Sequence, residues 1–162
     1  MKNIWMTILS FMVMTVPVNA ADIDNILVEK AERKMYLRSG DEVIKTYDIV
    51  LGKNPIGHKQ KSGDGRTPEG KYIISGRNPH SKYHLSLRIS YPNAEDVERA
   101  QKAGVSPGGD IMIHGNPNGI PEFLFRLRWR KDWTAGCIAV NNAEIEEIWD
   151  LVANGTEIVI KP

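Results

Sequence analysis

The chain has 162 residues, a length that suits one globular domain rather than two. Hydrophobic residues make up 41% and charged residues 25%, which excludes a disordered chain, a collagen-like chain and a membrane protein with several spans. The 21 Lys and Arg nearly balance the 20 Asp and Glu, giving a formal net charge of +1. Nucleic-acid binders carry a strong basic excess to neutralise phosphates, so this chain is not expected to bind nucleic acid.

Residues 1–20 have the three-part pattern of a secretory signal peptide. Lys2 supplies a positive charge, an apolar stretch runs from Ile4 to Val16, and Val18 and Ala20 occupy the positions that a signal peptidase reads. The apolar stretch is shorter than the roughly 20 residues that span a bilayer, so cleavage is favoured over an anchor. We therefore predict a signal peptide over 1–20 and a mature domain over 21–162. That domain would be periplasmic or otherwise extracytoplasmic, with no stable membrane insertion.

Short strands dominate the pattern of the mature chain, taken in order. Strands are expected at 26–30, 34–38, 43–51, 71–75, 85–91, 110–114, 137–140 and 157–161. A long loop is expected at 52–70, and 115–132 has mixed signals. Helices are expected at 93–103 and 143–153, the second capped by Asn141 or Asn142. The pattern predicts a β-rich α+β fold, a single domain resembling a β-sandwich or barrel with two or so helices.

The single cysteine is the first candidate for chemistry. Cys137 cannot form an internal disulfide, so it is either a buried inert residue or a reactive thiol with a function. It follows Thr134-Ala135-Gly136, a turn whose backbone N–H groups could converge on a developing oxyanion. A thiol needs a base, and His114 ends a strand just before Gly115. From spacing alone this pairing is suggestive only, and zinc sites built from several Cys are excluded.

These two motifs together resemble the L,D-transpeptidase catalytic domains of the YkuD family of bacterial cell-wall enzymes. That family has a His-Gly, a variable insert, and then Ser/Thr-x-Gly-Cys followed by an apolar residue, which matches His114-Gly115 and Thr134 to Ile138. The Thr-Pro-x-Gly turn of the family is matched by Thr67-Pro68-Glu69-Gly70. The resemblance covers about residues 24–161 and implies a YkuD-type fold.

The resemblance implies a cysteine thioester mechanism on peptidoglycan tetrapeptide stems. Cys137 would be the nucleophile and His114 its base, with the ring oriented by a backbone carbonyl near Gly115. A thiolate–imidazolium pair would be chemically sound, because an adjacent His⁺ lowers the pKa of a thiol. No metal and no organic cofactor is implied. Supporting groups would come from Gly115, Thr134 and the oxyanion donors, the backbone N–H groups of Ala135, Gly136 and Cys137.

Some positions depart from the family pattern. Ala139 stands where the family often has Arg or Asn, which puts the usual contact to a substrate carboxylate in doubt. Basic residues of the 115–132 insert could replace that cation, or could form a solvated loop. We expect the lysines of the 52–70 loop to be solvated. The substrate-binding candidates are Asn116, Trp133, Arg126, Arg128 and Arg130.

Three functions remain open on the sequence. The first is an exported transpeptidase that passes the thioester to an amine acceptor. The second uses water at the same site, as an L,D-carboxypeptidase or an enzyme that releases wall-linked protein. The third is a non-catalytic peptidoglycan-binding module. The sequence does not specify the acceptor, the crosslink type, partner proteins or the oligomeric state.

Overall fold

A mixed eight-stranded sheet forms the centre of the protein. The computed structural model describes residues 22–128 and 131–162, and its strands follow the order β3-β2-β1-β8-β4-β5-β6-β7. The β1–β8 and β6–β7 pairs are parallel, whereas the other neighbours are antiparallel. The strands are β1 Asn25–Glu29, β2 Lys34–Ser39, β3 Glu42–Asp48, β4 Gly70–Ser81, β5 His84–Ile89, β6 Met112–His114, β7 Ile138–Ala139 and β8 Glu157–Lys161.

Strict alternation of apolar residues explains the central strands. Ile26 and Val28 of β1 are fully buried, and in β8 Ile158 and Ile160 lie beside them in register. One face of each strand thus faces the core, as the period of two requires. β8 runs over the predicted 157–161. The prediction of a β-rich single domain is confirmed, with a mixed sheet as its framework.

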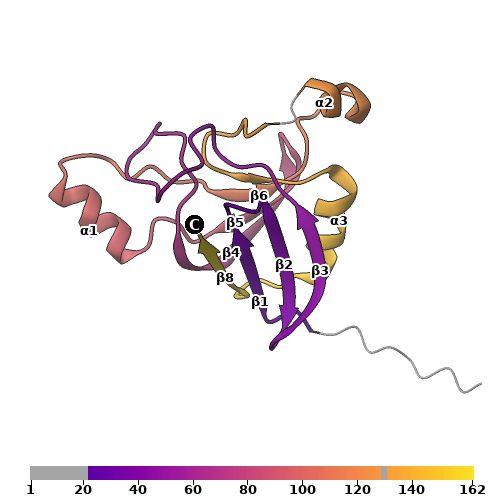
Figure 1. Cartoon of the computed structure of the whole chain (residues 1–162), viewed down its shortest axis with the longest axis horizontal. Coiled ribbons are helices and arrows are strands. Elements are labelled where there is room, and N and C mark those ends of the chain that lie inside the picture. The colour runs from indigo at the N-terminus through magenta and orange to yellow at the C-terminus, as the bar shows by residue number, and fades with distance from the viewer. Residues whose placement is uncertain (1–21, 129–130) are drawn as a thin grey trace, which may run out of the picture.

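Three helices are described: α1 Ala94–Lys102, α2 Glu122–Arg128 and α3 Asn142–Leu151. Figure 1 shows α1 and α2 projecting at opposite ends, while α3 lies against the strands. Asn141 caps α3, because its side chain accepts a hydrogen bond from the Glu144 N–H at 2.8 Å and its own N–H donates to the Glu144 carboxylate. Ile145 and Ile148 of α3 are fully buried. None of the described helices is long and apolar enough to cross a membrane.

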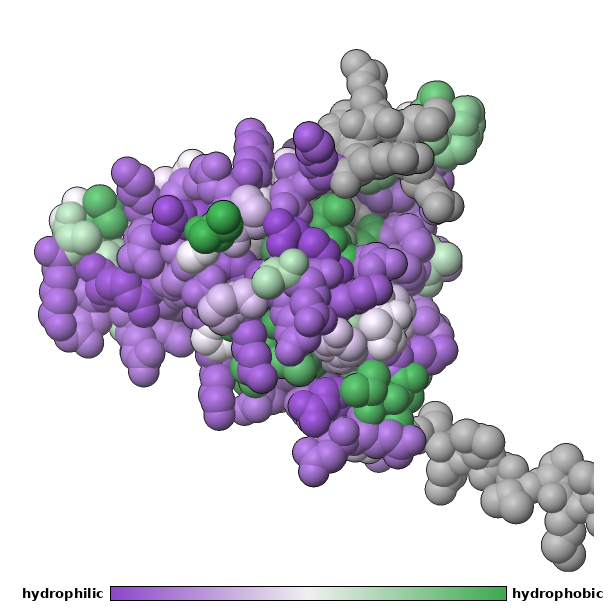
Figure 2. Space-filling view, viewed as in Figure 1, coloured by the Kyte–Doolittle hydropathy of each residue, from purple (hydrophilic) through white to green (hydrophobic). Residues whose placement is uncertain are grey.

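Two elements differ most from the sequence prediction, and β3, β6 and β7 are shorter than the predicted 43–51, 110–114 and 137–140. β4 continues to Ser81 instead of ending near residue 75, and its added residues are mostly exposed, so no apolar alternation marks them. α2 lies in the segment with mixed signals. Phe123 is 66% exposed and Leu124 is 47% exposed, so these apolar residues do not mark a face of the helix that packs on the core. Figure 2 shows hydrophobic residues over α2 on a face that is otherwise largely hydrophilic.

A buried lysine holds the long loop 52–70 to the first strand. Lys30 is 2% exposed, and its ammonium donates to the carbonyls of Gly57 at 2.8 Å and Thr67 at 3.2 Å. It also pairs with the Glu69 carboxylate at 2.7 Å. Three partners from one loop satisfy the buried charge. The loop therefore has a fixed position relative to the sheet.

The expectation that Lys59 is solvated is wrong. Its side chain is 3% exposed and its ammonium lies 2.8 Å from the Asp64 carboxylate. Asp64 also accepts hydrogen bonds from the backbone N–H groups of Gln60, Lys61 and Arg66. Burial alone would raise the pKa of Asp64, but Lys59 and these N–H groups lower it to about 2. The lysine thus belongs to the internal framework of the loop.

Asp64→Asn is expected to lower the free energy of unfolding by about 2 kcal/mol at pH 7. The folded pKa of Asp64 lies below its ordinary value of 3.8, so its stabilisation is present above about pH 4 and lost as the pH falls toward 2. Urea unfolding of both proteins across this range measures the difference. Asp41→Asn is the matched control, because the Asp41 side chain is fully exposed. A difference that stays constant down to pH 2 would contradict the prediction.

Candidate active site

The parallel pairing of β6 with β7 places the two segments that carry the predicted catalytic residues side by side. His114, the last residue of β6, pairs in register with Ala139 of β7. Cys137 lies two residues before Ala139 and immediately precedes β7, so alternation continued by one residue puts it on the same face as His114. β7 pairs on its other side with Val50, through a bridge to Ala139. Two segments 23 positions apart thus present a thiol and an imidazole on one face of the sheet.

The His114 ring is buried and held in one orientation. It is 3% exposed, and Nδ1 lies 2.7 Å from the Gly115 carbonyl oxygen. A carbonyl can only accept, so Nδ1 carries the proton and Nε2 has the free lone pair. This is the backbone carbonyl contact expected from the sequence. The Tyr83 ring lies 4.5 Å away and the Trp133 ring 5.6 Å away, measured between centroids.

The Cys137 thiol is partly exposed and faces a strained residue. Its Sγ donates to the Asp110 carbonyl oxygen at 3.5 Å. Asp110 has a φ of +54°, in the left-handed region that costs most non-glycine residues energy. This conformation lets the Asp110 carbonyl meet the thiol while its carboxylate pairs with Arg88 at 2.6 Å. Sequence reasoning did not find Asp110 or Arg88, since neither belongs to a motif.

Thr134 and Gly136 fix the turn before the thiol. The Thr134 hydroxyl donates to the Cys137 carbonyl at 2.7 Å and accepts from the Gly136 N–H at 3.1 Å. Gly136 has a φ of +139°, and a Cβ there would lie 2.6 Å from the Arg66 carbonyl oxygen. Only glycine fits this turn. Because the Gly136 N–H is bound to Thr134, it differs from the free oxyanion donor that the sequence suggested.

Gly115 and Asn116 pack against the start of α3. A Cβ on Gly115 would lie 2.7 Å from the Asn142 side-chain oxygen, which accepts a hydrogen bond from the Asn116 N–H at 2.8 Å. Asn116 is 5% exposed. The two residues therefore anchor the end of β6 to α3, and through it the His114 backbone.

The other predicted contacts are divided between described and undescribed parts of the chain. Trp133 packs edge-on against Phe125 at 5.4 Å between ring centroids, and with Tyr83 it forms the aromatic wall around His114. Within the described residues, the Trp133 indole N–H is buried without a hydrogen-bond partner. Arg130 lies outside the described residues, as do the side chains of Arg126 and Arg128. Ala139 is 2% exposed and has no charged group, so it cannot bind a substrate carboxylate.

Burial sets the proton positions in the free protein. It lowers the pKa of His114, against a smaller opposing effect of the hydrogen bond to Gly115. It also raises the pKa of Cys137; the Met112 backbone and Lys59 lower that pKa, while Asp110 raises it further. Both shifts disfavour charge, so the free protein holds a neutral thiol and a neutral imidazole. This differs from the preformed thiolate–imidazolium pair suggested by the resemblance.

No group of three or more His, Cys, Asp or Glu side chains in the described part of the chain is arranged to hold a metal ion. The described residues offer a thiol and, on the neighbouring strand, an imidazole with a fixed tautomer. Such a pair can transfer an acyl group between a leaving amine and an acceptor.

Comparisons with known proteins identify a family of similar domains. Residues 24–160 match the L,D-transpeptidase catalytic domain, YkuD. YafK of Escherichia coli (strain K12) is 29% identical over 131 residues, which are 78% of this chain and 45% of that protein. YkuD of Bacillus licheniformis is 27% identical over 137 residues, 80% of this chain and 61% of that protein. Both are named putative L,D-transpeptidases, and this chain spans about half their length.

Solved structures share the fold. The helical cell shape determining protein Pgp2 from Campylobacter jejuni has a TM-score of 0.66 and 26% identity, over 84% of this chain and 46% of that one. Bd1075 from Bdellovibrio bacteriovorus has a TM-score of 0.57 and 27% identity, over 88% of this chain and 49% of that one. An L,D-transpeptidase from Xylanimonas cellulosilytica, at 14% identity, 84% and 59% coverage and a TM-score of 0.55, supports the fold alone.

Proposed function

The chain belongs to the YkuD family of L,D-transpeptidase catalytic domains, and on that premise we propose that it is an exported cysteine transpeptidase of peptidoglycan. Its donor would be a tetrapeptide stem, and its acceptor an amine of a second stem. Residues 1–20 would be removed as a signal peptide, so that residues 21–162 act in the periplasm or otherwise outside the cytoplasm. The similarity to Pgp2, which is named as a helical cell shape determining protein, supports this location.

The observation that carries the proposal is the shared face of β6 and β7. His114 has its Nδ1 proton bound to the Gly115 carbonyl, so Nε2 is available as a base on the face that Cys137 shares. Cys137 Sγ would attack the carbonyl carbon of stem residue three while Nε2 takes the thiol proton. Proton transfer in this step needs no preformed thiolate. It therefore agrees with two groups that burial keeps neutral.

The same residue, His114, would carry the proton while the acyl-enzyme forms and while the acceptor attacks it. The oxyanion would be stabilised by the N–H groups of Ala135 and Cys137, because the Gly136 N–H already donates to Thr134. As the amide C–N bond breaks, the proton passes from His114 to the leaving nitrogen and D-alanine departs. The acceptor amine next gives its proton to His114 and attacks the thioester carbon. The C–S bond breaks, and the proton returns to Sγ.

Substrate contacts form a further part of the proposal. Trp133, beside the His114 ring, and Asn116, at the end of β6, are proposed to border the donor stem. Arg126, Arg128 and Arg130 are proposed to bind stem-peptide carboxylates. Alanine at Arg128 and Arg130 should then raise the apparent KM for the donor.

Mass spectrometry of purified protein with a disaccharide-tetrapeptide tests the function. A crosslinked dimer with loss of D-alanine is the expected product. A trimmed tripeptide alone would instead show that water resolves the acyl-enzyme. Unchanged substrate, with Cys137 still labelled by a thiol reagent, would favour a non-catalytic wall-binding module.

A further inference from the structure

The proposed donor carries a charge for which the motif residues supply no partner. The terminal carboxylate of a tetrapeptide stem belongs to the residue that departs, so it lies one residue from the carbonyl under attack. Ala139, two residues after the thiol, is a buried methyl side chain and carries no charge. Lys59 acts on the pKa of the thiol but is 3% exposed and paired with Asp64, so it cannot reach a substrate. A cation for this carboxylate must come from another element.

Arg88 lies in the same row of the sheet as the thiol. It pairs in register with Met112 of β6. Met112 precedes His114 by two residues, as Cys137 precedes Ala139, so the parallel pairing sets Met112 beside Cys137. Residues opposite one another in adjacent strands point to the same face. Arg88 and Cys137 therefore share a face, separated by one strand.

The position of Arg88 is also fixed by a contact chain to the thiol. Its Nη1 lies 2.6 Å from the Asp110 carboxylate, and the carbonyl of Asp110 accepts from Cys137 Sγ at 3.5 Å. The side chain is 53% exposed, unlike that of Lys59. The pair with Asp110 is made through Nη1, and a guanidinium has five N–H donors. A second carboxylate can therefore bind without displacing Asp110.

We propose that Arg88 is a specificity-determining residue that binds the terminal carboxylate of the donor stem. A guanidinium suits this role because its planar fork matches a carboxylate with two parallel hydrogen bonds. Asp110 orients the guanidinium from one side, and the strained Asp110 backbone ties that orientation to the thiol. The inference rests on the proposed function, since it assigns a subsite to the same substrate.

Two donors that differ only at the terminal carboxylate test this assignment. One is the tetrapeptide with a free carboxylate, and the other is the same peptide with a terminal amide. The wild-type protein should prefer the carboxylate by at least about tenfold in kcat/KM. Arg88→Gln should lower kcat/KM for the carboxylate donor by roughly tenfold to a hundredfold and leave the amide donor within about twofold. The kcat/KM of Arg88→Lys for the carboxylate donor should lie between the values of wild type and Arg88→Gln, since lysine keeps the charge but not the planar fork.

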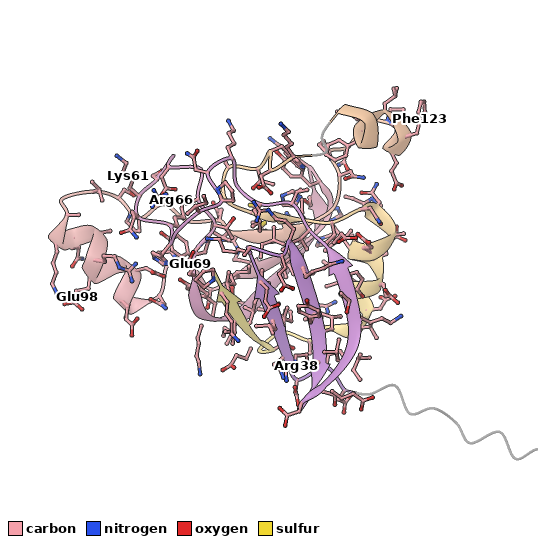
Figure 3. All side chains as sticks on the ribbon, viewed as in Figure 1. Arg38, Lys61, Arg66, Glu69, Glu98 and Phe123 are labelled. Carbon is pink, nitrogen blue, oxygen red and sulfur yellow. The ribbon has the colours of Figure 1, made fainter. Side chains whose placement is uncertain are left out.

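Arg38→Gln is the matched control. Arg38 also pairs with an exposed aspartate, Asp41 at 3.4 Å, but it lies in β2, with β1, β8 and β4 between it and β5. Figure 3 shows Arg38 at the end of the strands away from Arg66, whose loop packs on the Gly136 turn. Arg38→Gln should keep the wild-type preference for the carboxylate donor over the amide donor. Thermal unfolding of each variant checks that the fold is unchanged.

If Arg88→Gln lowers kcat/KM for both donors to the same extent, the assignment is overturned. It is also overturned if Arg88→Gln lowers kcat/KM for neither donor. Binding to Cys137→Ala protein separates this outcome from failure of the proposed function. If the wild-type protein turns over neither donor, the function fails. The Arg88 assignment then stands if Cys137→Ala binds the carboxylate peptide more tightly than the amide and the added Arg88→Gln removes that difference. Equal binding of both peptides to Cys137→Ala overturns it.

Discussion

Cys137→Ala is expected to abolish release of the terminal D-alanine from a tetrapeptide donor, by about 10⁴-fold or more in kcat/KM. The thiol is the sole cysteine, and no other residue can form the thioester. Mass spectrometry of the intact protein after mixing with donor should show the acyl adduct on wild type and none on the variant. The fold should be retained, because Cys137 is partly exposed and alanine leaves no large cavity.

Substantial D-alanine release by a folded Cys137→Ala protein would contradict the thioester mechanism. The near-ultraviolet circular dichroism of the variant should match that of wild type, which distinguishes loss of chemistry from loss of structure. Labelling with a thiol reagent supplies a second check. The wild-type reaction should have a midpoint above the ordinary thiol value, because burial raises the pKa of Cys137.

His114→Asn is expected to lower kcat by about 10²- to 10⁴-fold with little change in KM. The asparagine amide can occupy the position of Nδ1 and donate to the Gly115 carbonyl, but it offers no base in place of Nε2. The variant therefore separates positioning of the strand end from proton transfer. Steady-state kinetics with the tetrapeptide donor measures both constants.

The pH profile of wild type identifies the base. His114 must be neutral to accept the thiol proton, and burial lowers its pKa below the ordinary 6.5. Log kcat/KM should therefore rise with pH to a midpoint below 6.5 and then level off. His114→Asn should lack this acid limb, whereas His80→Asn, at an exposed position of β4, should keep it. An acid limb that survives in His114→Asn would assign the base elsewhere.

The motif residues were accessible from the sequence, and their surroundings were not. His114 and Cys137 stand out because a His-Gly at a strand end and a Gly-Cys turn are local patterns. Arg88 and Asp110 come from a strand and a loop with no local signal, and only the register of β5 with β6 brings them near the thiol. Burial of Lys59 depends on Asp64 folding back over it, which composition cannot indicate.

The same division holds for the fold. The five residues of β8 and the capped α3 follow from apolar periodicity and an Asn-x-x-Glu capping box. The prediction fails where packing does not involve an apolar stripe. α2 has only Phe125 buried among its first four residues, and the outer half of β4 is held by pairing with β5 rather than by burial. Periodicity detects contact with a core, so elements outside the core give no signal.

The central place of β8 has a consequence for how the domain is assembled. β8 is the only strand joining β1–β3 to β4–β7 in the described sheet, and it is the last of these strands along the chain. Contacts outside β8 also cross between the two parts: Lys30 with Glu69, Arg33 with Asp132, and the bridge between Val50 and Ala139. Without residues 157–161, β1 and β4 would each present an unpaired edge. The five residues of β8 therefore complete the hydrogen bonding of both parts of the sheet at once.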